Sequence, residues 1–329
     1  MSQLPPALIE THPTTEYRLT HLTWHPHWRA VLDRFAATVP VLGPVLLVSY
    51  ERPDDAEDAD DLTAPWREPA WKCLHLSSDV ITDPGLRREM DQFANAFYEF
   101  ELPDDDAAIV TDMLVGADPD AFQHLLGWMR GAVVEITGER LSAHAVPTTH
   151  AGNKDGSGGL FPPHADMWHT ELLFNVFNRV LPGSNGVPLL YPIDSVWDIL
   201  ADAGMPRAHV DDMRSELANA AVCGNFEDFN GHIYNPEHPW CEAATAALQQ
   251  AAWCHPMRPG EGYFVNDRRW LHGRTPIAVD ATEHDRAHRL YRLGYNNRRL
   301  MERAASEGFD WTLAGTRKAG CMDQPQDFA

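Results

Sequence analysis

The chain has 329 residues, of which 44% are hydrophobic and 22% are charged, a composition that is ordinary for a globular protein with a sizeable core. Its formal net charge of −22 argues against nucleic acid as a partner, because binding to a phosphate backbone needs a basic face. No apolar run approaches the ~20 residues that span a bilayer, so no membrane partner is expected. Five cysteines without a C-x-x-C pair, and an N-terminus without a secretory signal, predict a cytoplasmic protein.

The first 139 residues have the pattern of a mostly helical region. A helix is expected around residues 24–38, and an acidic loop is expected over residues 51–62. Apolar residues recur at helical spacing over residues 84–99, where Asp83 can cap the first turn, and again over residues 119–135. This part of the chain is therefore predicted to support a core that lies further along.

From residue 140 the chain changes to short apolar runs separated by Gly, Pro, Asn and Asp, which is typical of strands and turns. A helical insert is expected over about residues 194–252, and a weakly patterned tail over residues 301–329. The predicted fold class is mainly β with flanking helices. Its core, over residues 140–300, is expected to be a double-stranded β-helix, or jelly roll, within a single domain of residues 1–329.

Three residues have the chemistry of a mononuclear non-heme Fe(II) site, which needs two imidazoles and one carboxylate and keeps further coordination positions open. His164 and Asp166 are two positions apart, so in a strand both side chains point the same way. His272 follows a turn and a short apolar strand over residues 259–271, and it can supply the second imidazole from a distant strand. His164, Asp166 and His272 are the candidate metal ligands and catalytic residues.

The ordered set of motifs resembles the Fe(II)/2-oxoglutarate-dependent dioxygenases of the clavaminate synthase and taurine dioxygenase superfamily. The matching stretches are Pro163–Met167, residues 178–186, residues 260–268, His272–Thr275 and Arg289–Tyr295. The resemblance implies Fe(II), 2-oxoglutarate as co-substrate and O₂. It also implies oxidation, by C–H hydroxylation, of a small molecule such as an amino acid or an amino-acid-derived intermediate of secondary metabolism. It does not indicate an oligomeric state.

A second pair of residues imitates the metal-binding motif. His169 and Glu171 lie in a W-H-T-E stretch that resembles the W-H-T-D of taurine dioxygenase-like enzymes. The apolar strand over residues 172–181 follows at once, which leaves no room for the loop that the family places between ligand and strand. His164 and Asp166 are therefore favoured.

The far carboxylate of 2-oxoglutarate needs a fixed cation, and the planar head of arginine suits it. By the resemblance, Arg289 fits best because Tyr295 follows six positions later, while Arg286 and Arg292 stay open. A threonine that helps relatives to hold 2-oxoglutarate is replaced here by Pro188, which cannot donate a hydrogen bond. The alternative function is a cupin-like isomerase or a small-molecule-binding protein, which would not need the arginine-rich last strand.

Overall fold

The computed structural model describes the chain in separate stretches. They are residues 9–12, 19–42, 46–49, 72–100, 102, 107–115, 119–137, 142–147, 161–164, 172–177, 186–223, 232–267, 269–276 and 289–295. Within them, helices contain more residues than strands do, so the expectation of a mainly β protein was too narrow.

The strands form two sheets of mixed direction. In spatial order, the nine-stranded sheet consists of β1 (Ile9–His12), β2 (Leu19–Trp24), β5 (Ala107–Val110), β11 (Gly262–Asn266), β8 (Leu172–Phe177), β13 (Arg289–Tyr295), β6 (Ser142–Pro147), β4 (Lys72–His75) and β3 (Leu46–Ser49). The four-stranded sheet consists of β10 (Trp253–Cys254), β9 (Pro188–Pro192), β12 (Trp270–Arg274) and β7 (Phe161–His164). The β2–β5 pair is parallel, and the other described pairs are antiparallel.

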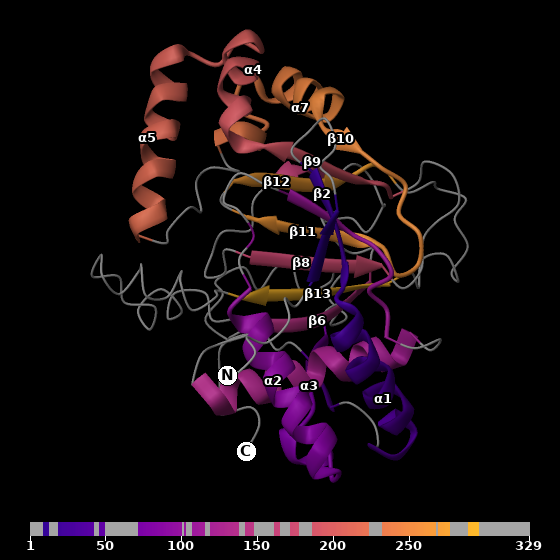
Figure 1. The fold of residues 1–329 in the computed structure, drawn as a ribbon. Coiled ribbons are helices and arrows are strands. Elements are labelled where there is room, and N and C mark those ends of the chain that lie inside the picture. The colour runs from indigo at the N-terminus through magenta and orange to yellow at the C-terminus, as the bar shows by residue number, and fades with distance from the viewer. Residues whose placement is uncertain are drawn as a thin grey trace.

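From β6 onward, the chain passes repeatedly between the two sheets. Strands β6, β8, β11 and β13 belong to the larger sheet, whereas β7, β9, β10 and β12 belong to the smaller one. Figure 1 shows the strands of both sheets stacked between two groups of helices. Residues that are distant in sequence therefore meet between the sheets.

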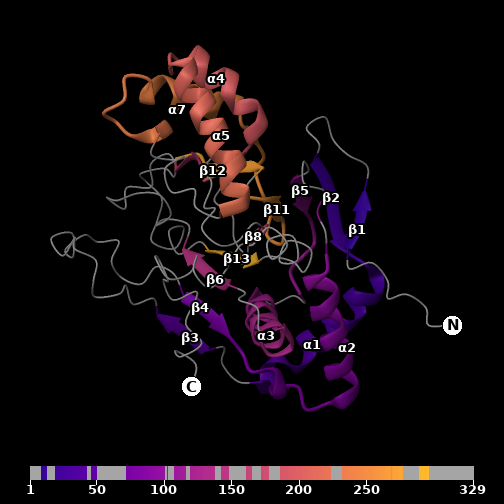
Figure 2. The ribbon, with the colours of Figure 1, turned by 90° about the vertical axis from the view of Figure 1, so that its left-hand side faces the viewer.

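Two groups of helices cover this pair of sheets (Figures 1 and 2). The N-terminal group packs on the larger sheet and consists of α1 (Pro26–Leu42), α2 (Pro84–Tyr98) and α3 (Pro119–Thr137), with the short 3-10 turn η3 (Ser78–Val80). The inserted group packs on the smaller sheet and consists of η4 (Ile193–Ser195), α4 (Val196–Asp202), α5 (Arg207–Cys223) and α7 (Cys241–Ala251). None of the helices in the described stretches is long and apolar enough to cross a membrane.

Side-chain alternation along the strands divides the core into layers. In β13, Tyr291 and Leu293 pack into the core beneath α1–α3, whereas Leu290 packs into the core between the sheets. In β12, Trp270 faces the space between the sheets, whereas Leu271 faces the inserted helices. Alternate positions of these strands thus face either the covering helices or the space between the sheets. Polar residues can meet between the sheets only if they occupy the positions of the second kind.

The sequence predicted the helices better than the N-terminal strands. The helix expected over residues 84–99 is confirmed as α2, with Asp83 accepting hydrogen bonds from two backbone N–H groups at its N-terminus. In the described part of the region before residue 140, helices contain more residues than strands, but β1 to β5 also lie there and extend both edges of the larger sheet. Four of these five strands have only four residues, too few for a clear alternating pattern. The acidic stretch over residues 51–62 lies outside the described residues.

Candidate metal centre

The two predicted histidine ligands face each other on neighbouring strands. His164 is the last residue of β7, and it is the register partner of His272 in β12. Their ring centroids are 4.5 Å apart, and both side chains are buried. Antiparallel pairing therefore brings together two imidazoles that are more than a hundred positions apart in sequence.

The imidazole of His164 is oriented by its own strand. Its Nδ1 lies 2.9 Å from the carbonyl oxygen of Pro162. A carbonyl oxygen can only accept, so we assign the ring proton to Nδ1 and the lone pair to Nε2. This tautomer is the one that an Nε2 metal ligand requires.

His272 has a similar arrangement. Its Nδ1 lies 3.0 Å from Oδ1 of Asp267, a fully buried carboxylate in the turn after β11. The two atoms are at ion-pair distance, but their directions do not align for a hydrogen bond with each other. The negative charge still favours a proton on Nδ1, and Nε2, the nitrogen that would bind a metal, lies 3.4 Å from Nη2 of Arg292. Two adjacent imidazoles with an oxygen next to each Nδ1 are donors that fit Fe(II), which also needs an oxygen ligand.

The carboxylate of the predicted triad cannot be placed. Asp166 lies outside the described residues, and so does the rival pair His169 and Glu171. Across the described part of the chain, no set of three His, Cys, Asp or Glu side chains is arranged to hold a metal. The choice between the two motifs therefore stays a prediction.

The predicted co-substrate arginines differ in what the structure places. Arg289 opens β13 and Tyr295 ends it, as expected, but the side chain of Arg289 and all of Arg286 lie outside the described residues. Arg292 donates from Nε to Oδ1 of Asn175 at 3.0 Å, and its Nη2 lies 3.4 Å from Nε2 of His272. The arginine that the structure brings to the histidine pair is thus Arg292.

A second buried arginine lies near the same end of β12. Arg274 is two positions after His272, and it is almost fully buried. Burial lowers the pKa of its guanidinium to about 10, so it remains charged at neutral pH. Its Nη1 donates to the carbonyl oxygen of Thr275, whose hydroxyl accepts from the backbone N–H of Val187. Pro188, in the place of the family's threonine, pairs with Arg274 in the β9–β12 ladder.

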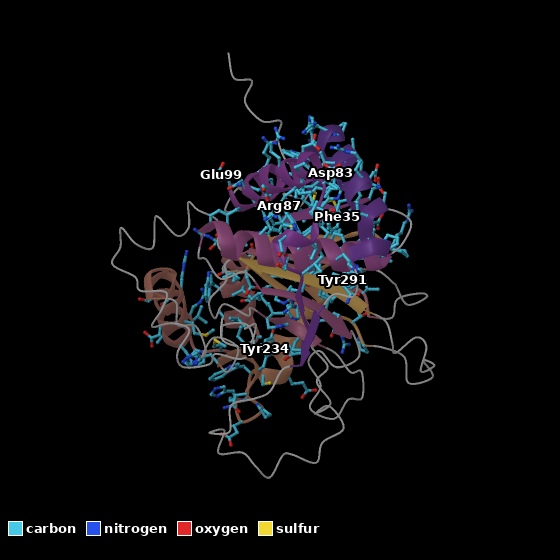
Figure 3. The ribbon with its side chains drawn as sticks, turned by 90° about the horizontal axis from the view of Figure 1, so that it is seen from below. Phe35, Asp83, Arg87, Glu99, Tyr234 and Tyr291 are labelled. Atoms are coloured by element: carbon cyan, nitrogen blue, oxygen red, sulfur yellow. The ribbon has the colours of Figure 1, made fainter. Side chains whose placement is uncertain are left out.

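Two residues near the histidines were not predicted from the sequence. Asn175 is fully buried in β8 and contacts Arg292. Tyr234 lies with the inserted helices (Figure 3), and its hydroxyl donates to the carbonyl oxygen of Pro163, next to His164. A lone asparagine in the apolar run Leu172–Phe177 was the available signal for the first. We found no sequence signal for the second.

Similar solved structures include non-heme iron oxygenases. Non-heme iron oxygenase OrfP aligns with 88% of this chain and 98% of its own, at 13% identity and a TM-score of 0.40. Asparagine oxygenase AsnO aligns with 85% of this chain and 93% of its own, at 15% identity and a TM-score of 0.38. PvcB of Pseudomonas aeruginosa aligns with 90% of this chain and 94% of its own, at 10% identity and a TM-score of 0.34.

Complexes of two of these oxygenases contain iron and succinate. In one, OrfP also holds (3S)-hydroxy-L-arginine, and in the other, AsnO also holds 3-hydroxyasparagine. No family model and no curated protein matches the sequence of this chain. The chain is thus similar, at low sequence identity, to non-heme iron oxygenases.

Proposed function

We propose that this protein is an Fe(II)- and 2-oxoglutarate-dependent oxygenase that hydroxylates an amino acid or an amino-acid-derived small molecule. The observation that carries the proposal is the facing pair His164 and His272, in which Nδ1 of His164 lies 2.9 Å from a carbonyl oxygen and Nδ1 of His272 lies 3.0 Å from a carboxylate oxygen. Asp166 is proposed as the third ligand. The amino-acid class of substrate comes from the sequence resemblance.

Each of these side chains has a proposed role in the reaction. The three ligands would hold Fe(II) on one face and leave the other positions open. Bound iron and 2-oxoglutarate would supply the oxidising chemistry with O₂. The residues of the chain orient the ligands, and an arginine of the 286–292 segment would hold a carboxylate. Arg289 is favoured by the sequence resemblance and Arg286 is its alternative, whereas the contact with His272 supports Arg292.

A jelly-roll core is part of the proposal. The order β6-β13-β8-β11 in one sheet and β7-β12-β9-β10 in the other supports it, since a double-stranded β-helix needs strands that alternate between two facing sheets. The contact between Arg292 and His272 supports it too, because it joins the two sheets across their inner faces.

The proposal is tested by separating binding from turnover. Wild-type protein and His272→Ala are loaded anaerobically with Fe(II) and titrated with 2-oxoglutarate, and the charge-transfer absorption of the iron–keto acid complex is followed. Wild type should develop this absorption and the variant should not. O₂ is then admitted with a library of L-amino acids, and succinate release and mass gain are measured.

One amino acid or derivative should raise succinate release and gain the mass of one oxygen atom. An isomerase or a binding protein would instead convert or bind the small molecule without consuming 2-oxoglutarate. Absence of the charge-transfer complex in iron-loaded wild type would therefore refute the oxygenase.

A further inference from the structure

Among the described residues, Asn175 has a buried hydrogen-bond donor that meets no acceptor. Its side chain is fully buried, and its Oδ1 accepts a hydrogen bond from Nε of Arg292. Its Nδ2 has no hydrogen-bond partner in the described structure. A buried N–H group without a partner costs free energy, and such groups are rare in folded proteins. An exception beside a candidate site points to a ligand that supplies the missing acceptor.

The position of Asn175 limits what that ligand can be. Asn175 is the register partner of Arg292 in the larger sheet, and Arg292 reaches His272 in the smaller one. The unused donor is therefore part of the group of residues that surrounds the candidate iron site. An amide N–H can only donate, so the occupant has to present an acceptor atom.

The charges around Asn175 favour an anion. The guanidinium of Arg292 is planar, always charged and suited to a carboxylate. Arg274, two positions after His272 and on the same face of β12, is also buried and charged. Bound Fe(II) would add more positive charge at the histidines. A carboxylate can accept from the donor of Asn175 and lie beside the positive charge of Arg292.

We propose that Asn175 and Arg292 together bind a carboxylate group of a small molecule held at the iron site. The inference rests on the proposed function, because the carboxylate belongs either to 2-oxoglutarate or to an amino-acid substrate. Both are carboxylates, and binding experiments separate them.

The test uses two substitutions of Asn175. Asn175→Asp keeps the shape and the acceptor toward Arg292, but replaces the donor with an anionic oxygen that repels a carboxylate. Asn175→Ala removes the donor without adding charge. Asn95→Asp makes the same change in α2, where the amide of Asn95 donates to the carbonyl oxygen of Asp91. Circular dichroism and thermal unfolding identify which variants are folded.

Each folded protein is loaded anaerobically with Fe(II) and titrated with 2-oxoglutarate or with 2-oxopentanoate, which lacks the distal carboxylate. In a second arm, stabilisation against heat is measured with L-amino acids and with their amides. Asn175→Asp should weaken binding of the carboxylate by about 10- to 100-fold, the range of a charge-assisted hydrogen bond. Asn175→Ala should weaken it less, and Asn95→Asp should not change it.

The outcomes identify the source of the carboxylate. A loss for 2-oxoglutarate but not for 2-oxopentanoate supports binding of the distal carboxylate. Unchanged keto acid binding, together with lost stabilisation by free amino acids, supports binding of the substrate carboxylate. Unchanged binding of both classes in both Asn175 variants overturns the inference. Failure of the proposed function would instead appear in wild type, as iron-loaded protein that binds neither keto acid.

Discussion

Tyr234, in the helical insert, donates a hydrogen bond to the carbonyl oxygen of Pro163, the residue that precedes His164. The insert thereby contacts the backbone of the strand that carries a predicted metal ligand. Burial raises the pKa of the Tyr234 phenol, so its hydroxyl keeps its proton at neutral pH and can donate. This contact orients the end of β7 from outside the sheet.

Tyr234→Phe should weaken metal binding without unfolding the protein. The ring still fills its place among the inserted helices, but the Pro163 carbonyl loses its donor and the His164 backbone is less well held. Residues that support metal ligands typically contribute about 10- to 100-fold in affinity, so a loss of about tenfold is expected. Titration with Co(II), followed by its absorption spectrum, measures it.

Tyr191→Phe is the matched control. Its hydroxyl also donates to a backbone carbonyl, that of Ser195, and its ring packs in the same cluster. This change removes a hydrogen bond that does not contact β7, so the metal affinity should stay at the wild-type value. Equal losses of affinity in the two variants would show that Tyr234 acts only through general stability.

Substitutions of the two arginines in β13 should differ in their effect on binding of a carboxylate ligand. Arg289 and Arg292 are three positions apart, so in a regular strand only one of them can face the histidines. Position 289 has the parity of Tyr291 and Leu293, which pack toward α1–α3. We therefore expect Arg292→Met to weaken binding of a carboxylate ligand by about 30- to 1000-fold while metal binding persists.

Arg289→Met is the comparison, and it should change that affinity by less than about threefold, because a charge that does not contact the ligand acts on it only weakly. The measurement is the anaerobic titration of the Fe(II) protein with 2-oxoglutarate and with amino acids. If Arg289→Met alone weakens binding of 2-oxoglutarate, the choice made from the sequence resemblance is correct and the face that we infer for position 289 is wrong.

The candidate acidic ligands can be separated by removing each carboxylate. Asp166→Ala should abolish tight Fe(II) binding, since it deletes one of three ligands, whereas Glu171→Ala should bind iron as wild type does. Iron content after gel filtration and succinate release with 2-oxoglutarate report the two properties. Normal iron content in Asp166→Ala, with loss in Glu171→Ala, would assign the site to the second motif.

The sequence predicted the parts of this site that depend on residue type and spacing. The two histidines were found because an H-x-D pair and a distant H-G-R-T stretch are separated by strand and turn signals. Helix α2 was found because its apolar residues recur at helical spacing after a capping aspartate. These signals are local, so no knowledge of strand pairing was needed.

The residues that were missed depend on pairing between distant segments. Asn175 meets Arg292 only through the β8–β13 register, which no local pattern specifies. The face of β13 that carries Arg292 depends on the same register, and so the arginine could not be chosen by spacing alone. Tyr234 reaches Pro163 across 71 positions, through packing of the insert on β7. Such contacts follow from the tertiary fold.

Gly262→Ala should destabilise the protein strongly. Strand β11 passes so close to β8 that a Cβ at this position would lie 1.8 Å from the carbonyl oxygen of Asn175. The obstacle is backbone, which cannot rotate away as a side chain can. We expect a loss of unfolding free energy at or above the upper end of the ~1–3 kcal/mol typical of overpacking. Urea denaturation measures it.

Gly204→Ala is the comparison that measures backbone strain without a steric clash. Gly204 has a φ of +100°, but an added Cβ would meet nothing within 4 Å. This change should cost only the strain of an L residue in that conformation, roughly 1–2 kcal/mol. A loss in Gly262→Ala no larger than in Gly204→Ala would mean that the two strands separate easily at that point.

The stability contributed by Asp83 should depend on pH. Its carboxylate accepts from the backbone N–H groups of Leu86 and Gly85 at the start of α2, and these hydrogen bonds hold its pKa below the ordinary value. Because the folded pKa lies below the unfolded one, the stabilisation is complete above an unfolded pKa of about 3.9 and is lost as pH falls through the folded pKa. Asp83→Ala should therefore lower the melting temperature at pH 7, and its deficit relative to wild type should shrink as the pH falls below about 4.

Asp83→Asn is the control, since its amide oxygen can accept the same two hydrogen bonds but does not titrate in this range. The difference in melting temperature between Asp83→Asn and Asp83→Ala should therefore be the same at every pH. A deficit of Asp83→Ala that stays constant from pH 7 to about pH 3.5 would show that the charge of Asp83 does not contribute to capping α2.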